Sequence, residues 1–437
     1  MKTRFILTLT IILLSQFSFA QLPLPASEQK EAIALSGGIA HLGNGEVIQN
    51  SIIGFDNGMI TFALDASANP DLSNYTLIDI SGQHVYPGFI LPNSEIGLAE
   101  IGAVDASVDK NEVGDMNPNI RSLIAYNTDS KIIPTLRFNG ILIAETTPSG
   151  GRISGTSSAM NMEGWNWEDA VLKTDIGVHM NWPNRISWNF DMQTWSYKKE
   201  ANKKYSQSVN ELKAFFDDAM AYSKSSKKRS NMKLEAMKGL FTGEKTLFIN
   251  AGSSKEIIES VVFAQQSGVL KIVIITSTGA IDAAPFLVEN QIPVVLQNLH
   301  RLPDNSDMEV NLPYQLAYLL NEAGVLVSLA HSGSVMRSRN LPFYAGTAVA
   351  YGVDKEDAIK MITLNTARVL GIDNEVGSLE KGKRATLFVS SGDALDMRTN
   401  NVQLAFIDGK LIDLNGEQQA LYERYTEKYK AQGLNKQ

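Results

Sequence analysis

Eight strand candidates lie between residues 85 and 372, seven of them apolar runs and one, over 157–162, weaker and reached through a glycine-rich loop, and helical segments alternate with the others. Alternating strand and helix signals predict parallel strands joined by helices, and the length is close to the roughly 250 residues of a (β/α)8 barrel of the TIM type. The sequence therefore predicts such a barrel over residues 87–372. Its strand candidates are residues 85–97, 139–148, 157–162, 176–183, 246–252, 271–279, 292–298 and 325–332.

The segments on either side of the predicted barrel have a different texture. Residues 28–86 and 373–416 consist of short alternating runs broken by turn dipeptides. Asn57-Gly58, between two such runs, is a strong hairpin signal. Both segments are therefore predicted to form antiparallel β structure, and residues 417–437 are predicted to form a C-terminal helix.

Residues 1–20 have the three parts of a secretory signal peptide. Lys2 and Arg4 precede an apolar run over 5–14, and small residues end at Ala20. The alternative is a membrane anchor, but the run is shorter than the about 20 residues that a spanning helix needs. We expect a cleaved signal, a periplasmic or secreted protein, and no membrane association after cleavage.

Composition narrows the classes of chemistry and of partner. The chain has no cysteine, which excludes disulfides, a cysteine nucleophile and thiolate-bound zinc. Its net charge of -8 argues against a nucleic-acid partner.

One basic run falls in a lysine-rich insertion predicted to be helical over 196–242. It could be a docking site, but a solvated helical hairpin is the favoured interpretation. The run consists of Lys224, Lys227, Lys228, Arg229 and Lys233.

Several motifs resemble those of the amidohydrolase superfamily, in the branch of imidazolonepropionases and Xaa-Pro dipeptidases. The first is the Pro87-Gly88 strand, which is similar to the first barrel strand of that branch. The others are the pattern Thr-x-Asn-x-Ala-x-x-Leu-Gly over 363–371 and the pattern Val-Gly-Ser-Leu-Glu-x-Gly-Lys-x-Ala over 376–385. This resemblance implies an α/β fold in which residues 28–86 and 373–416 join into one β-sandwich beside the barrel. It also implies hydrolysis of carbon-nitrogen bonds, with metal ions that acidify a bound water.

The metal-ligand positions that the resemblance implies are occupied by other residues. Asn93 and Glu95 stand in place of the two histidines of the first strand, and His179 stands in place of the lysine of the fourth. Amides and hydroxyls are poor ligands for zinc-like ions. We therefore predict no binuclear metal site and no cofactor. The remaining positions hold Asn250 and Thr278 instead of histidines, and either His331 or Ser332 instead of the aspartate.

Polar residues at the ends of the predicted strands should still meet at the barrel mouth, where such barrels bind their ligands. We predict that the chain binds a small molecule there without metal, as a pseudo-enzyme, either alone or beside a paralogous amidohydrolase subunit. The alternative is an active hydrolase with a remodelled site, in which Glu95, His179 and His331 act, with or without a metal ion. The pocket candidates are Asn93, Glu95, Glu145, His179, Asn250, Thr278, His331 and Ser332.

Overall fold

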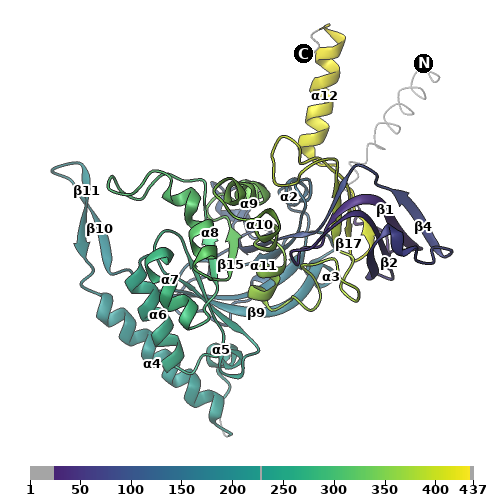
Figure 1. The fold of residues 1–437 in the computed structure, drawn as a ribbon. Coiled ribbons are helices and arrows are strands. Elements are labelled where there is room, and N and C mark those ends of the chain that lie inside the picture. The colour runs from purple at the N-terminus through teal and green to yellow at the C-terminus, as the bar shows by residue number, and fades with distance from the viewer. Residues whose placement is uncertain (1–23, 227–228, 434–437) are drawn as a thin grey trace, which may run out of the picture.

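The computed structural model describes residues 24–226 and 229–433. The predicted signal peptide, residues 1–20, lies outside this part. A central barrel separates a β-sheet domain from a small β-hairpin at the opposite end of the molecule (Figure 1). No helix in the described ranges has the length and apolarity that crossing a membrane requires.

The barrel sheet contains eight strands, and each predicted run contains or overlaps one of them. The first and last strands are bridged by the backbone of Met361 and Ile362, whose carbonyls accept from Leu329 and Ile90 at 3.1 and 2.8 Å. The TIM-like fold class is thus confirmed. In order around the sheet the strands are β6 (Phe89–Ser94), β7 (Ile141–Thr146), β8 (Ile153–Asn161), β9 (Val171–Asn181), β12 (Thr246–Asn250), β13 (Ile272–Thr276), β14 (Val294–Gln297) and β15 (Val327–Ala330).

Strand β8 departs from the regular (β/α)8 pattern. It runs antiparallel to both β7 and β9. The reason is the short connection over residues 147–152, which can join neighbouring strands only as a hairpin, because a parallel crossover needs a dozen or more residues. The expectation of eight parallel β/α units is therefore wrong at this position.

The helices around the barrel differ from the prediction in the insertion. Residues 186–201 form the hairpin of β10 (Ile186–Asp191) and β11 (Ser196–Ala201), so the start of the predicted helical insertion is β structure. Phe216 of α4 is fully buried, and its ring lies 5.1 Å from that of Phe263. Helix α4 is thus part of the barrel shell and not a solvated hairpin. The larger barrel helices are α4 (Tyr205–Lys224), α5 (Met232–Thr242), α6 (Ser254–Gln266), α7 (Ala280–Glu289), α8 (Leu312–Glu322), α9 (Leu341–Ala350), α10 (Lys355–Lys360) and α11 (Leu364–Leu370).

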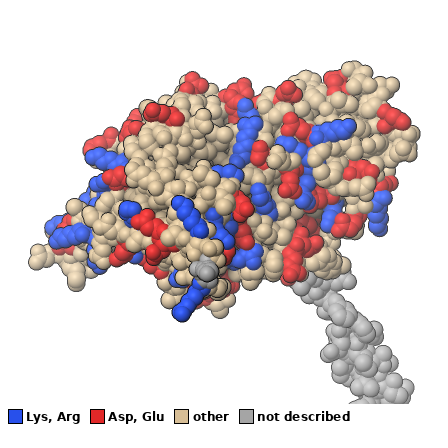
Figure 2. Space-filling view, turned by 90° about the horizontal axis from the view of Figure 1, so that it is seen from below, with Lys and Arg blue, Asp and Glu red and all other residues tan. Residues whose placement is uncertain are grey.

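Charged side chains are mixed on the molecular surface. Figure 2 shows acidic and basic residues interspersed over the face that it presents. Of the predicted basic run, Lys224 ends α4 and Lys233 lies in α5, while Lys227 and Lys228 lie outside the described residues.

The segments before and after the barrel share one eight-stranded sheet. Strand β5 pairs antiparallel with β16, with Pro87 opposite Leu387, which joins the two halves as expected. Asn57 and Gly58 both have positive φ angles, 47° and 77°, as a tight hairpin turn requires. Helix α12 (Glu417–Ala431) follows the sheet, and the last residues of the predicted range, 434–437, lie outside the described residues. The strands are β18 (Lys410–Leu411), β17 (Val402–Ile407), β16 (Leu387–Ser390), β5 (His84–Pro87), β1 (Ala32–His41), β2 (Val47–Asp56) and β3 (Met59–Asp65), with β4 (Tyr75–Asp79) also paired to β1.

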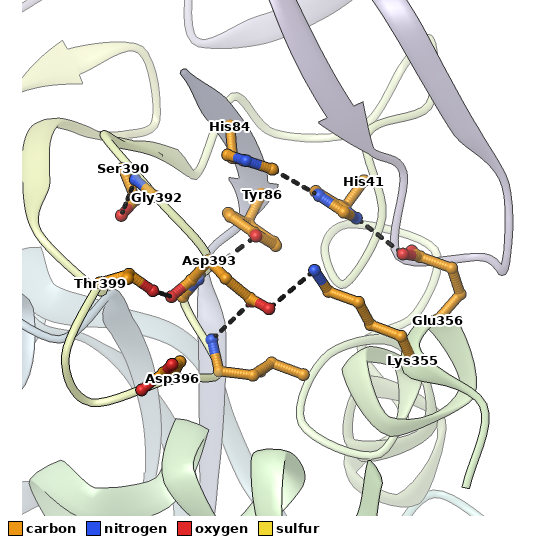
Figure 3. A network of polar contacts seen from close by, with 12 residues as sticks. His41, His84, Tyr86, Lys355, Glu356, Ser390, Gly392, Asp393, Asp396 and Thr399 are labelled. Atoms are coloured by element: carbon orange, nitrogen blue, oxygen red, sulfur yellow. Dashed lines mark hydrogen bonds and ion pairs between the residues drawn. The ribbon is translucent and has the colours of Figure 1, made fainter. Parts of the chain in front are cut away.

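A polar network joins this sheet to the barrel (Figure 3). His41 of β1 contacts Glu356 of α10 at 2.7 Å through Nδ1 and His84 of β5 at 3.0 Å through Nε2. Its ring stacks on Tyr86 with centroids 4.4 Å apart, and Lys355 pairs with Asp393 at 2.9 Å. These contacts fix the sheet domain against the last barrel helices, so His41 and His84 have a structural role.

Candidate functional site

A pocket of about 310 Å³ opens at the carboxyl ends of the barrel strands. Five of the predicted pocket residues line it: Asn93, Glu95, Asn250, His331 and Ser332. The other lining residues are almost all small or polar. They are Ser94, Thr147, Pro148, Ser149, Gly150, Ser154, Asn181, Gln297, Gly333, Ser334, Val335 and Ser338.

The other three predicted residues do not line this pocket. Glu145 and His179 lie deeper in the barrel, at 0% and 1% exposure. Thr278 points elsewhere, because its hydroxyl bonds to Asp304 and accepts from Arg301 at 3.2 Å.

Glu145 is the centre of a buried network under the pocket. Its Oε1 accepts from the hydroxyl of Ser157 at 2.7 Å and lies 2.9 Å from Nε2 of His179. Its Oε2 accepts from the backbone N–H of Asn93 at 2.8 Å. An ionised carboxylate only accepts, so His179 donates its Nε2 proton. One carboxylate thus connects four barrel strands.

This network is not a nucleophile triad, although it contains serine, histidine and glutamate. Ser157 and Glu145 both approach the same ring nitrogen of His179, at 3.0 and 2.9 Å. In a triad the base uses one nitrogen for the nucleophile and the other for the carboxylate. The His179 ring also stacks on Phe248 at 4.7 Å, inside the barrel. The three residues therefore support the pocket floor.

Two asparagines with left-handed backbone shape the rim. Asn93 has φ 50° beside a register shift between β6 and β7, which turns its N–H toward Glu145. Asn298 also has φ 50°, and its side chain accepts from the N–H of Ser332 at 2.9 Å and donates to its hydroxyl at 2.8 Å. Asparagine tolerates this conformation better than most residues. Both rim positions are thus held by hydrogen bonds.

His331 carries a buried polar atom with no partner. Its Nδ1 lies 2.7 Å from the hydroxyl of Tyr344, and its Nε2 has no hydrogen-bond partner within the described chain. The side chain is 8% exposed, and burial, helped by Arg337, lowers the pKa of His331 to about 4. The imidazole is therefore neutral at physiological pH. The hydroxyl of Thr147, also in the lining, is a second such unpartnered atom.

The residues at the mouth do not fit the superfamily's metal ions. Glu95, the only carboxylate among the lining residues, pairs with Lys110 at 3.0 Å. Apart from the imidazole of His331, the other polar side chains of the lining are amides and hydroxyls, which bind zinc-like ions weakly. In the part of the chain that the structure describes, no three His, Asp or Glu side chains are grouped as a metal site would need. Glu95, His179 and His331 are thus not assembled as metal ligands.

Sequence reasoning missed Gln297 and Ser154 as pocket residues. Strand alternation could have found Gln297, because Val295, two positions earlier, belongs to the apolar cluster that fills the barrel interior. Ser154 carried no such signal, since its direction depends on the antiparallel course of β8.

Comparisons with known proteins agree with this architecture. The model of the Amidohydrolase family matches residues 315–412. Adenine deaminase 3 of Rhizobium meliloti (strain 1021) is 31% identical over 87 residues, which is 20% of this chain and 14% of the relative. The imidazolonepropionase of Flavobacterium psychrophilum is 30% identical over 112 residues, or 24% of this chain and 27% of the relative. The chain thus matches only a small part of these relatives' lengths.

A solved structure extends the likeness to the fold. The crystal structure of an amidohydrolase from Thermotoga maritima MSB8 has a TM-score of 0.76 and 22% identity, and the match covers 87% of this chain and 99% of that one. The chain thus has the fold of this amidohydrolase structure, and its residues 315–412 match the sequence model of the Amidohydrolase family.

Proposed function

We propose that the protein binds a small neutral molecule in the barrel mouth and that it does so without a metal ion, as a pseudo-enzyme. The observation that carries this is the pocket lining, in which amides and hydroxyls predominate and only one carboxylate, Glu95, and one imidazole, His331, remain of the ligand types that hold catalytic metal ions. A pocket of about 310 Å³ is at the lower end of the range for small-molecule sites.

The lining also indicates the chemical class of the ligand. Asn250 and Gln297 each carry both a donor and an acceptor, whereas Asn181, whose Nδ2 donates to Gly151 and Ser154, contributes only an acceptor oxygen. The unpartnered Nε2 of His331 and hydroxyl of Thr147 would gain a partner from a bound polar ligand. The single carboxylate is already paired with Lys110, so the lining carries little net charge. These features favour a small amide or cyclic imide, the substrate class that the family resemblance implies.

Export and partnership belong to the same proposal. The pattern of residues 1–20 supports a cleaved signal and a periplasmic or secreted protein. A pseudo-enzyme of this kind could act alone as a sensor, or as the inactive subunit beside a paralogous amidohydrolase. Sequencing of the N-terminus of the exported protein, and co-purification from its native host, would test these two points.

The binding proposal predicts a ligand response that depends on Asn250. We expect hydantoin, succinimide or glycyl-proline to raise the thermal midpoint of the purified protein, with no added metal. Truncation of Asn250 to alanine should weaken binding at least about tenfold, because the lost carboxamide bonds leave a buried ligand group unpaired. Titration calorimetry would measure this, with Asn189→Ala, on the distant hairpin, as the matched control.

Elemental analysis of the purified protein would distinguish the metal-free binding protein from the alternative, a metal-dependent hydrolase. We expect elemental analysis to find no stoichiometric zinc, manganese or iron. If metal were bound stoichiometrically, and if turnover of any of the three probes were lost in Glu95→Gln, the proposal would be wrong and a remodelled hydrolase would be established.

A further inference from the structure

The hairpin of β10 and β11 projects from the mouth side of the barrel. It follows the carboxyl end of β9, which closes at Asn181, and it stands away from the barrel at the end opposite the sheet domain (Figure 1). Its six residue pairs run from Ile186 and Ala201 to Asp191 and Ser196. Within the described residues, neither strand pairs with a third strand.

The register gives the hairpin two unlike faces. Trp188 pairs with Lys199 and Phe190 pairs with Tyr197, so these side chains share a face with Ile186. The ring of Trp195 reaches the same face, because it lies edge-on to Phe190 with centroids 6.0 Å apart. The opposite face is entirely polar. It consists of Ser187, Asn189, Asp191, Ser196, Lys198 and Glu200.

The aromatic face is open to solvent. Trp188, Tyr197 and Trp195 are 59%, 65% and 82% exposed. None of the hairpin side chains joins the hydrophobic clusters of the described chain. An isolated two-stranded hairpin is marginally stable at best in water. A face of this kind therefore gains stability from a protein surface that covers it.

We propose that this aromatic face, formed by Ile186, Trp188, Phe190, Trp195 and Tyr197, is a self-association surface covered by the same face of a second copy of the chain. Two copies related by a two-fold axis present identical patches to one another, so a self-complementary apolar face is sufficient. Tryptophan and tyrosine are the residues that dominate the binding energy of protein interfaces.

The exposed area is adequate for a stable dimer. A large aromatic side chain offers about 150 to 250 Å², so the four aromatic side chains and Ile186, exposed between 45% and 82%, expose roughly 450 to 700 Å² together. A standard interface buries about 800 Å² on each partner. The aromatic face thus supplies most of one side of such an interface, before any contribution from the neighbouring loops.

The charges on the hairpin favour a second copy over a lipid surface. Lys198 is paired with Asp191, and the Lys199 amine lies 4.8 Å from the centre of the Trp188 ring. The two lysines of the hairpin are matched in number by Asp191 and Glu200 on its polar face, so the hairpin as a whole has no net positive charge to attract anionic headgroups. The aromatic face carries one cation, Lys199, whose exposed amine rests against the Trp188 ring and can stay in water at the edge of the contact, so the electrostatic cost of packing two copies together is small.

The test measures the mass of the full mature chain in solution. We expect light scattering after size exclusion to give a dimer, and the double variant Trp188→Ala, Tyr197→Ala to dissociate at least about tenfold more readily. The double variant Ser187→Ala, Asn189→Ala, on the opposite face of the same hairpin, should remain dimeric. A second variant, Tyr197→Lys, should give the same loss by placing like charges across the two-fold axis.

Thermal midpoints at a concentration where every variant is monomeric will show whether each variant keeps its fold, since the substituted side chains are exposed. A chain that stays monomeric up to its solubility limit would overturn the proposal, as would a dimer that resists both variants. Flotation with vesicles of phosphatidylethanolamine and phosphatidylglycerol, lost in Tyr197→Lys, would assign the face to a lipid surface instead.

Discussion

Replacing Glu145 with alanine should lower the free energy of unfolding by about 3 to 5 kcal/mol, the cost of removing one partner from a buried charged network. The carboxylate accepts from Ser157 and Asn93 and meets His179, all within 2.9 Å. Without it, the N–H of Asn93 loses its acceptor, and Ser157 and His179 keep only the 3.0 Å contact between them and the 3.4 Å bond from Ser157 to the Gly177 carbonyl. Each buried unpaired group costs about 1 to 3 kcal/mol. Equilibrium unfolding in urea, followed by circular dichroism, would measure the loss.

Two variants make this result specific. Glu145→Gln keeps an acceptor oxygen of the same reach but places a second donor among existing donors, so its loss should be smaller than that of alanine. Glu95→Ala removes a carboxylate at the rim, where its partner is the half-exposed Lys110, and should change stability by about 1 kcal/mol or less. Equal midpoints for Glu145→Ala and the unmodified protein would show that the pocket floor does not depend on Glu145.

The barrel strands could be predicted because they are buried on both faces. A strand such as Ile272–Thr276 gives a continuous apolar run, which stands out from helical periodicity. The direction of β8 could not be predicted in the same way. Its run has no apolar alternation, and its serines and threonines are all buried, so the antiparallel course depends on contacts with β7 and β9.

The alternation of side chains along each strand could predict which residues point to the barrel mouth, but only to within one or two residues along the strand. Asn250 closes β12 two positions after the inward-facing Phe248, and Ser332 follows β15 two positions after the inward-facing Ala330, so alternation brings both side chains to the pocket. Glu145 and His179 face inward as well, but one layer deeper, and sequence alone does not specify how far each strand extends before the barrel opens. Thr278 does not line the pocket because its hydroxyl donates a hydrogen bond to Asp304, which lies in a later loop. Depth and loop contacts are properties of tertiary packing.

His331 predicts a measurable dependence of stability on pH. Burial holds its pKa in the folded protein at about 4, whereas the ordinary value is 6.5. As pH falls from 6.5, the unfolded chain binds a proton at this histidine before the folded chain does, so acid favours unfolding. The contribution of His331 to the free energy of unfolding should therefore be fully present above about pH 6.5 and should be lost as the pH falls to about 4. The full difference in pKa would exceed 3 kcal/mol, but solvent in the open pocket screens it, and we expect about 2 kcal/mol.

The variant His331→Asn isolates this contribution from other titrating groups. Its carboxamide can keep a hydrogen bond with the hydroxyl of Tyr344, which lies 2.7 Å from Nδ1 of the histidine, but it does not titrate. Any constant loss from the smaller side chain shifts the whole stability curve and leaves its slope unchanged. Urea unfolding at several values between about pH 4 and pH 7 should then show a shallower decline for the variant. If the two stability curves were parallel, the imidazole of His331 would be solvated in the folded protein and able to take up a proton. The pocket would then not offer its ligand a neutral imidazole at Nε2.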